Sequence, residues 1–98
     1  MPAKEIPHLL VHTPKDNVGV VVIEGLKAHT DMLCVITEND STFRLTVNAD
    51  VPIGHKVALV DLKPGDTAIK YGEDIGKVVA PVGKGGHVHV HNLKTKRW

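Results

Sequence analysis

The residues with the clearest potential for chemistry are three histidines in one short stretch of the sequence. Residues 86–92 read GHVHVHN, so that His87, His89 and His91 alternate with valines. Strict alternation is typical of a half-buried β-strand, in which successive side chains point to opposite faces. We therefore expect the three imidazoles to share one face of a strand while the valines on the other face pack against a core.

The spacing of these histidines limits what they can bind. Neighbouring histidines on a strand lie about 6.6 Å apart, close enough for two rings to bind one metal ion. His87 and His91 would lie about 13 Å apart on a straight strand, so the strand alone cannot bring three ligands to one ion. We expect a metal or anionic-substrate site here that residues elsewhere complete; the alternative is a solvated strand face.

Two other short segments carry polar residues of interest. His55 and Lys56 follow Gly54, where a glycine allows a sharp turn or a close backbone approach. A surface turn is the simpler interpretation of this segment. Asp16 and Asn17 lie in a Pro- and Asx-containing segment, and their simplest role is turn formation.

Lys70 and Tyr71 place a cation and a phenol directly before Gly72. In a strand these two side chains face opposite ways, so both reach one site only if the chain bends at Gly72. A solvated lysine beside a packed tyrosine is the simpler interpretation. The sequence contains no GxSxG, P-loop, CxxC or HExxH motif, so it lacks the usual signatures of a self-contained enzyme.

Composition points to a small all-β domain. Lys and Arg number 12 against 11 Asp and Glu, which gives little support for nucleic-acid or membrane partners. Valine supplies 15 residues and only three residues are aromatic, as in a β-type, aliphatic core. Cys34 is the only cysteine, in an apolar run that suggests a buried hydrophobe. We expect a reducing, cytoplasmic location and no membrane span.

Glycine and proline breakers recur every 8–12 residues or so, and no segment shows a helical period. We expect one domain over residues 1–98 with little or no helix, a loose lead-in over about 1–7 and a basic tail over about 93–98. Its short strands are expected at 8–12, 18–23, 32–37, 42–47, 56–62, 67–71, 75–80 and 87–91. The segments 32–37 and 42–47 should form a hairpin.

Four segments in order carry a family resemblance: DNV at 16–18, GHKVAL at 54–59, IKYG at 69–72 with IG at 75–76, and GHVHVHN at 86–92. Together they resemble the small subunit, or N-terminal domain, of the altronate and galactarate dehydratase family, over about residues 10–93. The resemblance implies an SAF domain with a β-clip fold. The segments GVVVIEG at 19–25 and NLKTKRW at 92–98 are similar to the sulfo-lyase branch of this family.

The resemblance also implies a function. We expect the small subunit of a two-component lyase that acts on a hydroxy acid together with a large partner subunit and a divalent metal, typically Fe²⁺. In the sulfo-lyase branch bisulfite leaves (2R)-3-sulfolactate and pyruvate forms, whereas in the dehydratases water leaves. A metal or cationic clamp stabilises the charge that builds up beside the carboxylate, and a base removes the carbon-bound proton.

The candidate residues fit these needs as hypotheses. We assign catalytic roles to Lys70, Tyr71 and His89, metal binding to His87, His89 and His91, and substrate binding to His55, Lys56, Asn92, Asp16 and Asn17. Two alternatives stay open: a non-catalytic module that binds metal or carbohydrate, and a structural adaptor whose histidines are incidental. Tight metal binding by the isolated chain would favour the first, and full activity without the three strand histidines the second.

Overall fold

The fold was analysed in a computed structural model that describes residues 6–70, 72–89 and 91–94. The described residues form nine strands and no helix, so the all-β prediction is confirmed, and none of them lies in a helix able to cross a membrane. The strands are Leu9–Val11 (β1), Val18–Val21 (β2), Asp31–Ile36 (β3), Ser41–Thr46 (β4), Lys56–Ala58 (β5), Thr67–Lys70 (β6), Glu73–Val78 (β7), His87–Val88 (β8) and Leu93–Lys94 (β9).

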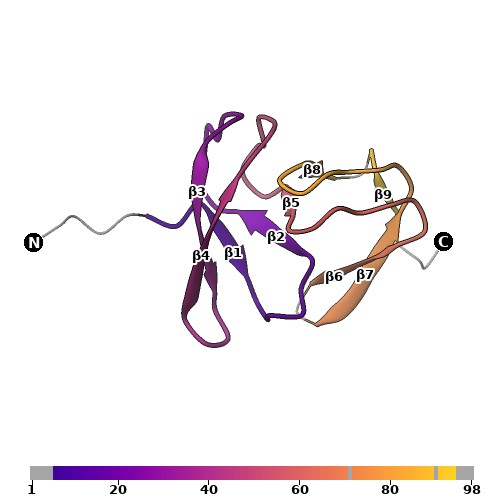
Figure 1. The fold of residues 1–98 in the computed structure, drawn as a ribbon, viewed down its shortest axis with the longest axis horizontal. Helices are drawn as coiled ribbons and strands as arrows, with labels where there is room; N and C mark the ends of the chain where they lie inside the picture. Colours follow the sequence, from indigo (N-terminus) through magenta and orange to yellow (C-terminus); the bar gives the residue numbers. More distant parts are fainter. Residues whose placement is uncertain (1–5, 71, 90, 95–98) are drawn as a thin grey trace, which may run out of the picture.

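The strands form two sheets that lie side by side along the long axis of the molecule (Figure 1). The larger sheet has the order β4-β3-β1-β2-β5-β8, and the smaller one has the order β6-β7-β9. The pair β1–β3 is parallel, and the other pairs are antiparallel. Strand β8 is therefore the edge of the larger sheet, next to β5.

Two aliphatic clusters stabilise this arrangement. The first lies within the larger sheet and includes Leu9, Met32 and Val57. The second joins the two sheets and contains Val18, Ala58, Leu62, Ala68, Val78 and Val88. Burying one such valine or leucine contributes roughly 1.5–3 kcal/mol. Alternation along β5 sends Val57 into one cluster and Ala58 into the other, so this strand connects both cores.

Cys34 belongs to the first cluster and is 0% exposed. Burial is the main cause that raises the pKa of its thiol to about 12. The thiol is therefore un-ionised at neutral pH and is not a nucleophile. This confirms the expectation that Cys34 is a small buried hydrophobe.

The predicted hairpin is confirmed, because β3 and β4 pair from Asp31–Thr46 to Ile36–Ser41. Several expected strand bounds were wrong, among them 18–23, which ends at Val21, and 75–80, which is found at Glu73–Val78. The strand expected over 56–62 ends at Ala58, and the strand expected over 87–91 is limited to His87–Val88. Leu93 and Lys94, expected in the basic tail, form β9. Residues 1–5 of the expected lead-in and 95–98 of the tail lie outside the described residues.

Candidate functional site

A turn held by Asn92 replaces the straight histidine strand. The Asn92 side chain donates from Nδ2 to the His87 carbonyl at 2.8 Å and accepts at Oδ1 from the His89 N–H at 3.0 Å. The backbone N–H groups of Asn92 and Leu93 both donate to the His89 carbonyl, at 3.1 and 2.9 Å. The chain therefore reverses after His89. As a result the rings of His87 and His91 have centroids only 4.9 Å apart, instead of the roughly 13 Å of a straight strand.

The register of β5 against β8 brings a fourth histidine to the same place. Val57 pairs with His87 and Lys56 with Val88, so one further step places His55 opposite His89. Their rings stack with centroids 3.6 Å apart and planes 11° from parallel. A turn just before β5 delivers His55 to this position, and it needs a glycine because Gly54 has φ +87°.

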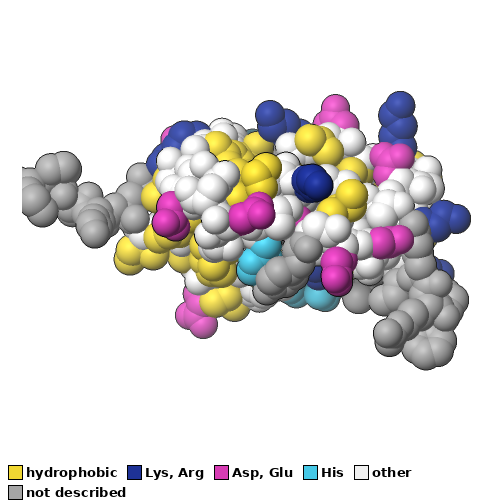
Figure 2. All heavy atoms as spheres, turned by 90° about the horizontal axis from the view of Figure 1, so that it is seen from below, with side chains coloured by type: hydrophobic (Ala, Val, Ile, Leu, Met, Phe, Trp, Pro, Cys, Tyr) yellow, Lys and Arg dark blue, Asp and Glu magenta, His cyan; other side chains and the backbone are white. Residues whose placement is uncertain are grey.

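His55 also contacts His87. The His55 Nδ1 and His87 Nε2 atoms are 2.8 Å apart, a hydrogen bond in which one ring supplies the proton. We call His55, His87, His89 and His91 the histidine cluster. Figure 2 shows histidine side chains near the middle of one face of the molecule. The grouping of His87, His89 and His91 that the sequence suggested is present, but the turn and the β5–β8 register create it rather than one strand face.

Two rings of the cluster, those of His87 and His89, have lowered pKa values. Burial lowers the pKa of His87, and the charges of His91, His55 and His89 lower it further. Burial is also the largest cause that lowers the pKa of His89, and the charges of His55, Lys56 and His91 lower it further. Neutral imidazole is the form that ligates metal ions and accepts protons. At neutral pH these two rings are therefore available for either task.

One ring nitrogen of the cluster has no partner. His89 Nδ1 is buried and makes no hydrogen bond, and no other buried side-chain N or O atom of the described residues is left without one. Buried polar atoms are nearly always satisfied, and exceptions often mark a role in binding or catalysis. His89 is therefore the member of the cluster most clearly prepared for a group that this chain does not supply.

Lys56 directly follows His55 of the cluster, and Lys70 is the second lysine that the sequence selected. Lys56 is half-buried at the start of β5, and burial followed by the charge of Lys70 lowers its pKa. Lys70 ends β6, at the border of the smaller sheet. The charge of Lys56 also reaches His89. Electrostatic interactions thus link Lys56 to His89 and Lys70 to Lys56, and the shared site predicted for these residues stays a prediction.

Asp16 and Asn17 are occupied by internal contacts. The Asp16 carboxylate accepts hydrogen bonds from Thr13 Oγ1 at 2.8 Å, Gly72 N at 2.8 Å and His12 N at 3.1 Å. It thereby ties the turn before β2 to the β6–β7 turn. These contacts give Asp16 a structural role, and its substrate-binding role stays a prediction.

The Asn17 side chain makes two hydrogen bonds to the backbone of β6, with the same pattern as those of Asn92 to residues 87 and 89. Its Nδ2 donates to the Thr67 carbonyl at 2.8 Å, and its Oδ1 accepts from the Ile69 N–H at 2.7 Å. Each asparagine amide thus bonds to the carbonyl of one residue and the N–H two residues later, as a residue of a neighbouring parallel strand would. Substrate binding by Asn17 or Asn92 stays a prediction, because all the amide contacts described here are internal.

The metal ligands and Tyr71 stay predictions as well. Tyr71 lies outside the described residues. Within residues 6–70, 72–89 and 91–94, no three His, Cys, Asp or Glu side chains are arranged to hold a metal ion. Sequence reasoning missed the pairing of His55 with His89. The matching starts of GHKV at 54–57 and GHVH at 86–89 are the signal that could have revealed it.

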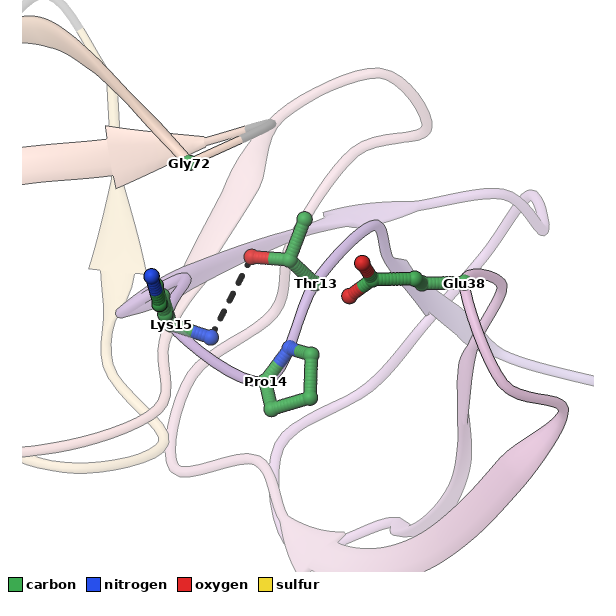
Figure 3. Close-up of a pocket in the computed structure, with 5 residues that line it drawn as sticks. All are labelled: Thr13, Pro14, Lys15, Glu38 and Gly72. Atoms are coloured by element: carbon green, nitrogen blue, oxygen red, sulfur yellow. Dashed lines mark hydrogen bonds between the residues drawn. The ribbon is translucent and has the colours of Figure 1, made fainter.

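A pocket of about 380 Å³ lies beside the turn that Asp16 holds, lined by Thr13, Pro14, Lys15, Glu38 and Gly72. Lys15 and Glu38 approach it from different loops, and the Lys15 N–H donates to Thr13 Oγ1 at 3.2 Å (Figure 3). Both charged residues are exposed. The pocket therefore offers no buried group for recognition, and sequence reasoning did not select its lining.

Comparison with known proteins gives consistent matches. The family model described as "Altronate/galactarate dehydratase SAF domain" matches residues 7–96. The chain is 69% identical over 67 residues to a protein of Paracoccus pantotrophus named (2R)-sulfolactate sulfo-lyase subunit alpha, covering 68% of this chain and all of that one. A Chromohalobacter salexigens protein of the same name is 48% identical over 89 residues, or 91% of this chain and 95% of the relative. The altronate dehydratase of Escherichia coli is 47% identical over 83 residues, or 82% of this chain and 15% of that enzyme.

Proposed function

This chain belongs to the altronate/galactarate dehydratase SAF domain family, and from that membership we propose that it is the small subunit of a two-component lyase that releases bisulfite from (2R)-sulfolactate. The two sulfo-lyase relatives support this choice of substrate, since the match to one of them spans nearly the whole of both chains. We place the reaction in the cytoplasm, as the single cysteine suggests.

The observation that carries the proposal is the composition of the site. It offers neutral imidazoles and two lysines, yet the described residues hold no set of three metal ligands. Such a site is half of an active site. A large partner subunit that covers the histidine cluster would supply the remaining groups.

The proposed reaction is a β-elimination. A base removes the proton from the carbon that carries the hydroxyl group, the carbon–sulfur bond breaks, and bisulfite leaves with the bonding electrons. The enol that remains takes up a proton on the former sulfur-bearing carbon and becomes pyruvate.

In this chain, His89 contacts the reacting substrate through its unpartnered Nδ1, and Lys56 and Lys70 attract the acidic groups. Preorganised cations of this kind stabilise the charge that develops beside the carboxylate. The main base belongs to the large subunit.

A divalent metal, which we expect to be Fe²⁺, is part of the proposal. The donor set suits such an ion, because His55 Nδ1 and His87 Nε2 face each other and the pKa of His87 is lowered. We propose His55 and His87 as ligands from this chain, with the remaining ligands on the large subunit. When bound, the ion would stabilise negative charge on the carboxylate and the oxygen beside it.

A second candidate substrate is a sugar acid. The 47% identity to Escherichia coli altronate dehydratase favours a dehydratase, in which water leaves instead of bisulfite. The site described above would serve either leaving group, since both eliminations begin with removal of a proton next to a carboxylate.

The test is reconstitution. The chain is mixed with its large subunit and Fe²⁺, and sulfite and pyruvate are measured with (2R)-sulfolactate, against each subunit alone. The proposal expects both products only from the mixture. Dehydration of altronate or galactarate by the mixture, without sulfite release, would show that the proposed substrate is wrong and that the proposal of a two-component lyase stands. Assembly of the two subunits without turnover of any of these substrates would overturn the proposal.

A further inference from the structure

The larger sheet has a second apolar face, opposite the face that holds the first core cluster. The strand registers place Leu10 of β1 beside Val20 of β2 and Val35 of β3, so these three side chains lie in one row. Their chain neighbours Leu9 and Val21 belong to the first core cluster. Successive residues of a strand point to opposite faces, so the row lies on the far side of the sheet from that core.

Two further aliphatic side chains extend this row. Leu33 lies two residues before Val35 and Val22 two residues after Val20, so both share its face. The Val22 N–H donates to the His8 carbonyl at 3.0 Å, which continues the pairing of β2 with β1 by one residue. Val22 is 37% exposed, the other four side chains are half-buried, and none of the five belongs to either core cluster of the described residues. We call this set the aliphatic face: Leu10, Val20, Val22, Leu33 and Val35.

The smaller sheet covers one end of the same side of the larger sheet. Val18 lies two residues before Val20 on β2 and pairs with Ala58 of β5. Val18 and Ala58 are both fully buried in the cluster that joins the two sheets. One face of β2 is therefore covered at Val18 and partly exposed from Val20 to Val22. Contiguous exposed apolar surface of this kind marks a site where another protein binds.

Polar residues border the aliphatic face on two sides. At the edge strand β4, the exposed Thr42 and Arg44 pair with members of the face. On the side of β5, Lys56 pairs with Val20, and neither ion pair found among the described residues includes Lys56. An apolar centre inside a polar rim is typical of protein–protein interfaces. The half-buried ammonium group of Lys56 favours a partner that brings a carboxylate to this rim.

The aliphatic face also adjoins the half-site. Val22 lies opposite Gly54, because the Gly54 N–H donates to the Val21 carbonyl and the Val21 N–H to the His55 carbonyl, both at 2.9 Å. Ile53, in the same turn, is 49% exposed. The exposed end of the face thus reaches the turn that delivers His55 to the histidine cluster. A large protein seated on the face is in position to reach the edge of the sheet that carries this cluster.

The occupant that fits is the large subunit rather than a second copy of this chain. The half-site lacks metal ligands, and a second copy would bring only the same incomplete set. The region matched in Escherichia coli altronate dehydratase is 15% of that enzyme, so that relative holds a much larger body of protein in the same chain as this domain. A face that is left partly exposed here is then the surface against which such a body packs.

We propose that the aliphatic face is the docking surface for the large subunit of the lyase. An aliphatic patch of that subunit packs on Leu10, Val20 and Val35, and one of its carboxylates pairs with Lys56. The proposal rests on the proposed function for the identity of the partner, and it does not depend on which substrate the complex cleaves.

The first test measures binding of the chain to the large subunit by isothermal titration calorimetry, without substrate. Val22→Lys and Val35→Lys should each raise the Kd by about tenfold to a hundredfold, because each places a charge in an apolar contact. Val60→Lys is the matched control, since Val60 is 48% exposed and lies outside the face, and it should bind like the parent. Urea unfolding checks that the variants are folded, which we expect above all for Val22→Lys because Val22 is already exposed. A parent-like Kd in both folded variants would overturn the docking surface, and so would a parent chain that does not bind the large subunit.

The second test needs neither a substitution nor turnover. The valine and leucine methyl groups of the chain are labelled with ¹³C, and the unlabelled large subunit is added while the methyl signals are followed by NMR. The signals of Leu10, Val20 and Val35 should shift or broaden, whereas those of the exposed Val60 and Val79 should not.

The outcomes separate the docking surface from the proposed reaction. Changes in these three signals, in a complex that turns over none of the proposed substrates, would keep the docking surface and lose the reaction. A complex that cleaves sulfolactate while the three signals stay unmoved would refute the surface and keep the reaction. The same changes in the concentrated chain alone, with none added by the large subunit, would make a second copy the occupant and refute the proposal.

Discussion

His55 Nδ1 lies 2.8 Å from His87 Nε2, although 32 positions separate these residues in the sequence. The contact exists because β5 and β8 pair at the edge of the larger sheet and present their histidines on one face. It turns two segments, each weakly suggestive alone, into one site. The predictions below concern what holds this site together and what it does.

Asn92 should matter for stability and for activity. Asn92→Ala removes the hydrogen bonds to the His87 carbonyl and the His89 N–H. Leaving these groups unpaired should cost about 1–3 kcal/mol of unfolding free energy, and the loosened turn should lower turnover by the complex. Urea unfolding and sulfite release measure the two effects. Asn48→Ala, which removes one exposed hydrogen bond to Lys84, is the control and should have little effect on either.

Asn17 should matter for stability alone. Asn17→Ala loses the bonds to Thr67 and Ile69, with an expected cost again of about 1–3 kcal/mol in urea unfolding. Because its amide faces β6, the KM of the complex for substrate should stay near that of the parent at a temperature where both are folded. A raised KM with unchanged stability would instead support the substrate-binding role predicted from the sequence.

Much of the fold follows from local sequence. Alternating Thr42, Phe43 and Arg44 and the polar residues 38–41 predict the β3–β4 hairpin, and the Val-rich segments predict β1 and β2. The histidine stretch was predicted wrongly as one strand, because its alternation of histidine and valine continues to His91. The hydrogen bonds of the Asn92 side chain instead hold the residues after Val88 in a turn. Which strand an asparagine side chain bonds to depends on the long-range register of the strands, and local sequence patterns do not encode this register. The stacking of His55 on His89 depends on the same long-range register, and only the matching starts of residues 54–57 and 86–89 hinted at it.

Acid should destabilise the folded chain through the cluster. The pKa values of His87 and His89 lie below the ordinary 6.5, so the unfolded chain binds protons at these residues at higher pH than the folded chain does. The free energy of unfolding should therefore decrease as the pH falls from about 6.5. Urea unfolding at pH 7.5 and 5.5 measures the decrease.

The double variant His87→Gln and His89→Gln should show a smaller loss of stability between these two pH values. His29→Asn is the matched control, because His29 is exposed and has a positive φ that asparagine tolerates. It should keep the full pH dependence. Equal slopes in the double variant and the parent would contradict the proposed contribution of the cluster.

Cys34 should be unreactive in the folded protein. Its thiol is fully buried and has a pKa raised to about 12, so a thiol reagent at pH 8 should react with it only after unfolding. The rate of reaction with a chromogenic disulfide, with and without urea, tests this. Rapid modification without urea would show that the β3–β4 part of the core opens readily.

The central claim is that the histidine cluster of this chain takes part in the reaction of the complex. The most direct measurement is kcat for sulfite release by complexes that carry His87→Ala or the control His29→Asn, with assembly checked by size-exclusion chromatography. The account predicts that His87→Ala lowers kcat by about a hundredfold or more, while assembly and the control stay unchanged. A fully assembled His87→Ala complex with kcat within twofold of the parent would contradict it and make the cluster structural.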